Sequence, residues 1–281
     1  MEFCADPSVL GDVEWWLCYL TTPKQISFYE SFGTVLLLLV LAAPLILLLG
    51  IAGALARSSR AAPLRWIGNI YTSMVRGVPD IVFFLFVPIA LDQTFEYIRH
   101  RALCPDVTAP VRQGADFVVC AAAKLPLSTA PQSVHDIYGF LLALVAFTIV
   151  FGAFAANIIH GGLAAVPRGQ LEAGEAIGMS RSQVFRRIHL PQMWRFALPG
   201  LSNLWMILIK ATPLLFLLGV EDVVYWAKEL GGAKTSRYAF PHGDWRLGYF
   251  IALLIFYLLL TWLSERGFRR LNRRYAAGFS T

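Results

Sequence analysis

The chain has 281 residues, of which 57 % are hydrophobic and 15 % are charged, and its formal net charge is +6. A soluble globular domain carries about 25 % charged residues. This composition and a mean hydropathy of +0.59 therefore exclude an ordinary soluble domain and indicate a membrane protein. Before the first apolar run the chain carries acidic residues, the reverse of the basic start of a signal peptide, so we expect no signal peptide (Glu2, Asp6, Asp12 and Glu14). Residues 1–30 then form an N-terminal segment, which the charge distribution described below places on the outer side.

Two membrane spans are predicted in the first third of the chain. A helix needs about 20 apolar residues to cross a bilayer, and the run from Ser31 to Ala56 exceeds that length. Pro44 within it predicts a kink. The second span is predicted from Trp66 to about Phe95, and its centre, MVRGVPDIVFFLF, carries two charges.

Those two charges, Arg76 and Asp80, have two interpretations. Opposite charges four residues apart on a helix form a structural ion pair. Alternatively, Gly77 and Pro79 break the helix, and a discontinuous helix with charges at membrane depth is typical of a substrate site. The sequence leaves both interpretations open.

The longest polar stretch, Leu91 to Asp136, shows no strong hydrophobic period, so we interpret residues of about 91–136 as an external insertion. It contains Cys104 and Cys120, while Cys4 and Cys18 lie in the N-terminal segment. All four cysteines then lie on the same outer side. Disulfides between Cys4 and Cys18 and between Cys104 and Cys120 are compatible with an oxidising periplasm, although spacing alone does not set their connectivity.

Three further spans complete a predicted set of five. The third runs from about Ile137 to Ile159, and Gly152 and Ala156 give it a face of small residues for helix packing. The fourth runs from about Phe196 to Val220, the segment Glu221 to Trp245 is polar and partly helical, and the fifth runs from about Leu247 to Leu263. An arginine-rich tail ends the chain (Arg266, Arg269, Arg270, Arg273 and Arg274).

Between the third and fourth spans, the polar segment from Leu171 to Pro191 predicts two short helices. Gly178 ends the first, and Ser180 and Gln183 form a capping box for the second. Val184, Phe185 and Ile188 share an apolar face with Phe185 as an aromatic knob, Pro191 stops the helix, and the remaining face is basic (Arg181, Arg186 and Arg187). A DNA-reading helix pair and a solvated basic loop have similar patterns.

The distribution of charge orients the chain. With the C-terminus inside, the cytoplasmic segments hold thirteen Lys or Arg and three acids, whereas the outer segments hold nine Lys or Arg and fourteen acids. The positive-inside rule therefore predicts an outer N-terminus and a cytoplasmic C-terminus. It also places residues of about 160–195 in the cytoplasm, which argues against DNA binding.

Catalytic and metal motifs are missing from the sequence. The segment GGAKTS at Gly231–Ser236 has Ala233 where a P-loop needs glycine. The five histidines show no metal-ligand spacing, and there is no GxSxG nucleophile elbow. We therefore expect a transport subunit rather than an enzyme, with no cofactor and no metal in this chain.

Several motifs resemble the permease subunits of ATP-binding-cassette importers. AAVPRGQLEAGEAIGMSRSQVFRRIHLPQ is similar to their EAA signature, with Gly174 in place of the third alanine. VRGVPD, ALPGLSN, IKAT and GVEDVV resemble the polar amino-acid subfamily, most of all subunits for histidine, lysine, arginine and ornithine or for opines. The resemblance extends from Ser31 to the C-terminus, with a longer insertion and with Pro213 after Thr212 where Ser or Ala is usual.

The resemblance implies an all-α type I importer fold at residues 31–281 in a bacterial inner membrane. It implies a second permease subunit that is a paralogue rather than an identical copy, two cytoplasmic ATPase subunits that hold ATP and Mg, and a periplasmic amino-acid-binding protein. By the same resemblance, a coupling helix that enters a groove on the ATPase contains Glu172, Ala173 and Gly178. Arg181, Phe185 and Arg186 flank this helix.

A basic amino acid as cargo requires an anionic partner for its side chain and donors for its carboxylate. We expect Asp80 to bind the cationic group and the other intramembrane polar residues to line the cavity (Arg76, Asn203, Lys210 and Thr212). Lys210 then faces the substrate carboxylate or pairs with Asp80. The alternatives are a permease for a neutral amino acid and, from another class, an ion-coupled secondary transporter, which five spans and a single midplane Asp fit poorly.

Overall fold

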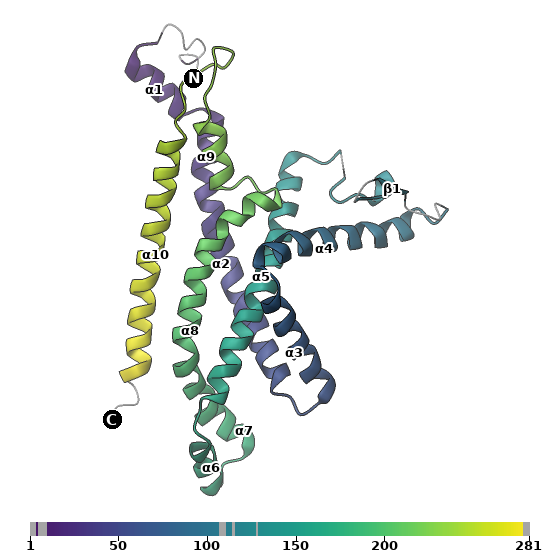
Figure 1. The fold of residues 1–281 in the computed structure, drawn as a ribbon, viewed down its shortest axis with the longest axis vertical. Coiled ribbons are helices and arrows are strands. Elements are labelled where there is room, and N and C mark those ends of the chain that lie inside the picture. Colours follow the sequence, from purple (N-terminus) through teal and green to yellow (C-terminus); the bar gives the residue numbers. More distant parts are fainter. Residues whose placement is uncertain (1–3, 5–9, 107–110, 114–115, 128, 278–281) are drawn as a thin grey trace.

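Long helices run side by side along most of the molecule (Figure 1). The structure is a computed structural model that describes residues 4, 10–106, 111–113, 116–127 and 129–277. The helices that run along this axis are α2 (Pro23–Arg57), α5 (Gln132–Ala164), α8 (Leu190–Ala211) and α10 (Arg246–Ala277). By length and composition, five helical segments of the described chain are able to cross a membrane. The predicted all-α membrane fold is confirmed.

The central contact of the fold joins α2 to α5 through small residues. A Cβ atom on Gly50 would lie 2.6 Å from that of Ala155, and one on Gly53 would lie 2.8 Å from that of Ala156. Gly152 in turn packs against the side chain of Leu49. Without a hydrophobic force between helices in lipid, such close backbone approach provides the packing energy. The predicted small-residue face of the third span is therefore used.

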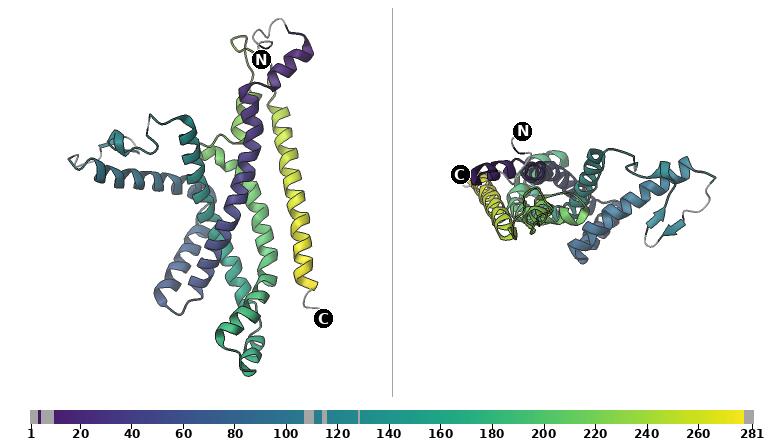
Figure 2. Two further views of the ribbon diagram at one scale, coloured as in Figure 1. Left: turned by 180° about the vertical axis from the view of Figure 1, so that it is seen from behind. Right: turned by 90° about the horizontal axis from the view of Figure 1, so that it is seen from above.

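The predicted second span is two helices rather than one, because the chain breaks between Gly77 and Asp80, as one of the two interpretations expected. It consists of α3 (Ala62–Gly77), which packs against α2 and α5, and α4 (Asp80–Leu103), which projects sideways from the long helices (Figures 1 and 2). The chain turns at Val78, which has φ −118° and ψ 144°. Proline disfavours helical geometry in the residue before it and cannot donate a backbone hydrogen bond, so Pro79 ends one helix and begins the next.

The helix α4 also extends into the stretch that lacks a clear period in the sequence. Its polar side chains, spaced four residues apart, hold the segment that follows. Asp92 accepts a hydrogen bond from the Tyr138 hydroxyl (2.7 Å), and Glu96 accepts one from the Leu125 amide (3.1 Å). His100 Nδ1 accepts one from the Cys120 amide (3.0 Å). This polar stripe on α4 masks the helical periodicity.

The rest of the insertion contains little regular structure. The strands β1 (Val111–Gln113) and β2 (Asp116–Val118) form an antiparallel hairpin, and η3 (Ala121–Ala123) is a single 3-10 turn. A disulfide joins Cys104 at the end of α4 to Cys120. The insertion is therefore tied to α4 both covalently and by the polar side chains above.

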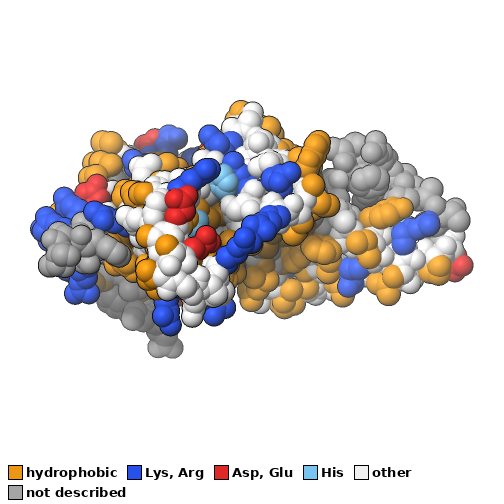
Figure 3. Space-filling model, turned by 90° about the horizontal axis from the view of Figure 1, so that it is seen from below, with side chains coloured by type: hydrophobic (Ala, Val, Ile, Leu, Met, Phe, Trp, Pro, Cys, Tyr) orange, Lys and Arg blue, Asp and Glu red, His pale blue; other side chains and the backbone are white. Residues whose placement is uncertain are grey.

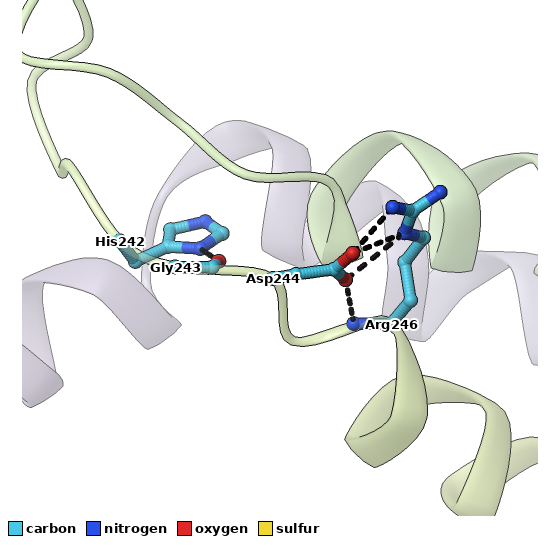
Figure 4. A network of polar contacts seen from close by, with 4 residues as sticks. All are labelled: His242, Gly243, Asp244 and Arg246. Atoms are coloured by element: carbon cyan, nitrogen blue, oxygen red, sulfur yellow. Dashed lines mark hydrogen bonds and ion pairs between the residues drawn. The ribbon is translucent and has the colours of Figure 1, made fainter.

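The N-terminal end of the molecule is an aromatic cluster. A disulfide joins Cys4 to Cys18 in α1 (Asp12–Leu20), and Trp15, Trp16 and Tyr19 pack on Trp245 in the loop before α10. That loop follows α9 (Val223–Gly231). In the loop the imidazole of His242 stacks on Trp245, and Asp244 binds the Arg246 guanidinium through both carboxylate oxygens (Figure 4).

The two short cytoplasmic helices of the prediction lie at the opposite end of the long axis from α1 (Figure 1). They are α6 (Arg168–Ala176) and α7 (Arg181–Val184). A π-helical turn, η4 (Phe185–His189), continues α7 directly into α8, and a 3-10 segment, η5 (Thr212–Leu218), follows α8. The end that carries α1 and the end that carries α6 and α7 are therefore separated by the full length of the helices.

Candidate coupling and substrate sites

The turn between α6 and α7 has the predicted geometry. Gly178 has φ +86°, a backbone conformation that residues other than glycine rarely adopt. Ser180 Oγ accepts a hydrogen bond from the Gln183 amide, and Gln183 Oε1 accepts one from the Ser180 amide at 2.8 Å. This reciprocal capping box fixes the start of α7 without help from other parts of the chain.

Gly174 explains how the two helices pack so closely. The residue is buried, and a Cβ atom at this position would lie 2.5 Å from Ile188 Cδ1 and 3.2 Å from Val184 Cγ2. The apolar face predicted for the second helix therefore points at α6 rather than outward. The glycine that departs from the EAA pattern is the residue that lets α6 rest on this face.

The structure does not present Phe185 as an exposed knob. Its ring is half-buried, lies edge-on to His189 at a centroid distance of 5.7 Å, and packs on the apolar cluster around Ile159 and Met193. The exposed large apolar side chain of this element is Ile177, which is 76 % exposed beside Gly178. Sequence reasoning missed it because a single apolar residue in a polar turn has no periodic partner.

Pro191 does not stop the helix, contrary to the prediction. It occupies the first turn of α8, directly after η4. A proline lacks the amide that would bond four residues back, and the wider π turn accommodates both the missing donor and the ring. The helical segment is therefore continuous from Arg181 to Leu218 and joins the α6–α7 pair rigidly to a membrane span.

The other predicted coupling residues lie on the surface of this end. Apart from Phe185, these residues are exposed (Glu172, Ala173, Gly178, Arg181 and Arg186). Lysine and arginine side chains outnumber acidic ones when the molecule is viewed from this end (Figure 3). The α6–α7 pair thus combines a rigid backbone, a basic surface and one protruding apolar side chain.

Near the helix break, the ion pair between Arg76 and Asp80, which was one of the two interpretations of the sequence, does not form. Arg76 instead donates to Asn157 Oδ1 (3.2 Å), which also accepts from Arg57 (3.0 Å). Asp80 is exposed in the first turn of α4, where a carboxylate is favoured by the helix dipole. No ion pair joins Asp80 to Lys210 among the described residues. Both side chains are exposed.

The remaining substrate candidates lie on or just beyond α8. Asn203 and Lys210 are exposed, but Thr212 is fully buried. The Thr212 hydroxyl donates to the Ile209 carbonyl (3.0 Å) and contacts the Tyr257 hydroxyl (2.9 Å). Thr212 therefore joins α8 to α10 within this chain and does not line an open surface, which differs from the prediction.

A polar pocket that the sequence did not predict lies between α2, α5 and the start of α9. It has a volume of about 480 Å³, and three carboxylates line it together with Trp226 (Glu30, Asp136 and Glu221). Burial and the charge of Asp136 raise the pKa of Glu221. These acids come from three distant parts of the chain, so no local motif signals the pocket.

One cluster of side chains in the insertion has the atoms that a metal ion would need. His100, Cys104 and Cys120 place their ligand atoms within 4.8 Å of one another. Both sulfur atoms are used by the disulfide, however, which leaves only an imidazole. These three residues therefore act as a structural clamp.

Comparison with known proteins places this geometry in one family. The model of the family described as "Binding-protein-dependent transport system inner membrane component" matches residues 46–277. The arginine ABC transporter permease protein ArtQ of Escherichia coli (strain K12) is 30 % identical over 79 % of this chain and 83 % of that protein. The histidine/lysine/arginine/ornithine transport system permease protein HisQ of Salmonella typhimurium is 32 % identical over 83 % and 86 %.

A solved structure has the same fold. A chain of an amino acid ABC transporter crystallised with histidines matches with a TM-score of 0.64 and 22 % identity, and the match covers 95 % of this chain and all of that one. A five-span helical fold and a family match over most of the chain lead to one conclusion. This chain belongs to the family of inner membrane components of binding-protein-dependent transport systems.

Proposed function

We propose that this chain is a permease subunit of an ATP-driven importer that moves a basic amino acid into a bacterial cell. The observation that carries the proposal is the α6–α7 pair, a rigid surface element continuous with α8, in a chain whose relatives include permeases named for arginine and for histidine, lysine and ornithine. The proposed orientation has an outer N-terminus and a cytoplasmic C-terminus, as the charge distribution predicts.

The α6–α7 pair is proposed to dock on a cytoplasmic ATPase subunit that holds ATP and Mg. Ile177 is the apolar anchor, and the exposed arginines and Glu172 orient the contact. Because helical structure is continuous from Arg181 to Leu218, a displacement of the docked pair is transmitted to α8 with little loss. Rocking of α8 against a second permease subunit, which we propose to be a paralogue, exposes the cavity to each side in turn.

The proposed cargo is a cationic amino acid delivered by a periplasmic binding protein. Three carboxylates line the pocket between α2, α5 and α9, at the end of the membrane region distant from α6 and α7. Their negative potential attracts a guanidinium or ammonium group and repels an acidic substrate. Farther along the path, Asp80 at the break between α3 and α4 is proposed to bind the cationic side chain, with Lys210 and Asn203 lining the cavity.

Transport by the assembled importer in proteoliposomes tests the proposal. Asp80→Asn is expected to reduce ATP-dependent arginine uptake at least tenfold while leaving assembly intact, and Asp12→Asn, which changes an exposed carboxylate on α1, is expected to have no effect. Unchanged arginine uptake by Asp80→Asn would refute its role in binding. Equal competition by leucine in the unmodified importer would refute the basic substrate but leave ATP-driven transport standing.

A further inference from the structure

An apolar groove opens between α10 and the other long helices near the α6–α7 end. It has a volume of about 350 Å³, within the range of small-molecule sites, and four helices contribute to its walls. Leu201 and Trp205 line it from α8, Ala155 from α5, and Leu271 from α10. Trp205 and Phe268 both line it, with ring centroids 6.4 Å apart and ring planes tilted by 54°. The groove is thus a defined slot between packed helices.

The end of this groove nearest the C-terminus has the character of a lipid headgroup region. Trp194 and Tyr275 line it, and such amphipathic rings favour the membrane interface. Exposed arginines follow on the same stretch of α10, with Arg270 and Arg274 next to the wall residues Leu271 and Tyr275. A long apolar slot that ends among cations matches the two parts of an anionic phospholipid.

The position of α10 also favours lipid over protein as the occupant. In its most apolar stretch of 18 residues, only 6 % is buried in this chain. Its outward face is a row of exposed apolar residues such as Leu254 and Leu258. That face is in contact with lipid when the helix spans a membrane. The groove lies on the inner side of the same helix.

We propose that this groove binds one anionic phospholipid, with an acyl chain between α8 and α10 and the phosphate near Arg274. The lipid then packs against the helix that the π-helical turn joins to α7. A lipid in this slot supports α8 where the coupling movement enters the membrane, so anionic lipid is expected to raise the ATP hydrolysis rate of the assembled importer. This last expectation rests on the proposed function, whereas lipid binding itself does not.

Native mass spectrometry of the assembled importer from phosphatidylglycerol or phosphatidylcholine nanodiscs tests the proposal. The unmodified protein is expected to retain phosphatidylglycerol at least fivefold better. Leu201→Trp, which fills the slot, and Arg274→Gln, which removes the charge, are each expected to abolish this preference. The matched controls Leu258→Trp, on the outer face of α10, and Arg273→Gln, one residue away, are expected to keep it.

Three results would overturn the proposal: no lipid retained by the unmodified importer, equal retention of both lipids, or equal losses in the test and control variants. Because Arg274 is exposed, Arg274→Gln leaves the packing intact and remains informative if Leu201→Trp misfolds. ATP hydrolysis is measured in the same two nanodisc preparations. An equal rate in both would contradict the proposed support of α8.

Discussion

The two ends of the long axis are stabilised by different means. The N-terminal end is fastened by a disulfide and by stacked rings, including Trp16 on Trp245 at a centroid distance of 5.1 Å. The α6–α7 end contains no cysteine and relies on backbone geometry, with a positive φ at Gly178, a capping box and the close approach at Gly174. Side-chain fastening suits a surface that stays fixed, whereas backbone fastening leaves the surface side chains of α6 and α7 free to contact a partner.

The largest expected effect comes from disturbing the packing of α6 on α7. Gly174→Val adds three carbon atoms where Ile188 Cδ1 would lie 2.5 Å from the first of them. We expect α6 to be displaced and ATP-dependent uptake to fall more than tenfold. Gly169→Val on the same helix is the control, because nothing lies within 4 Å of a Cβ there. Equal effects of the two substitutions would show that close packing at Gly174 is not required.

Removing the covalent clamp of the insertion is expected to act on stability rather than on coupling. The disulfide between Cys104 and Cys120 spans 16 residues, and a loop of that length corresponds to about 3 kcal/mol. We expect the double variant Cys104→Ser/Cys120→Ser to melt at a lower temperature and to retain the ATPase subunit on purification. Loss of the ATPase subunit at an unchanged melting temperature would contradict the separation of these two roles.

A smaller effect is expected at the start of α9. Asp222 is fully buried, accepts hydrogen bonds from the Val224 and Tyr225 amides through Oδ1, and leaves Oδ2 without a partner. Burial raises its pKa from 3.8 to about 6. Because the native state holds this proton more tightly than the unfolded state, the contribution of Asp222 to stability falls as pH rises from about 4 to 6.

Asp222→Asn tests that sign directly. The amide oxygen still caps α9 and no charge is buried, so we expect the variant to melt several degrees higher than the unmodified protein at pH 7.5 and at nearly the same temperature at pH 4. Thermal melts at the two pH values measure the difference. A variant that is less stable at pH 7.5 would mean that the charged carboxylate is stabilised by its surroundings.

The helices could be predicted from the sequence because long apolar runs and local caps are encoded in consecutive residues. Ser180 and Gln183 are three residues apart, and their capping box forms as predicted. Pro191 misled the prediction because it follows a π-helical turn and lies in the first turn of α8, where a proline does not end a helix. Ile177 and the pocket lined by Glu30, Asp136 and Glu221 depend on tertiary arrangement, which hydrophobic periodicity does not report.

Site-specific photocrosslinking tests the difference between the two ends most directly. Ile177 at the α6–α7 end and Val13 on α1 are 76 % and 73 % exposed, so a photoreactive residue at either position has similar access to a partner. In membranes that contain the assembled importer, we expect position 177 to form an adduct with the ATP-binding subunit and position 13 to form none. An adduct from position 13, or none from position 177, would contradict the assignment of the α6–α7 pair as the coupling element.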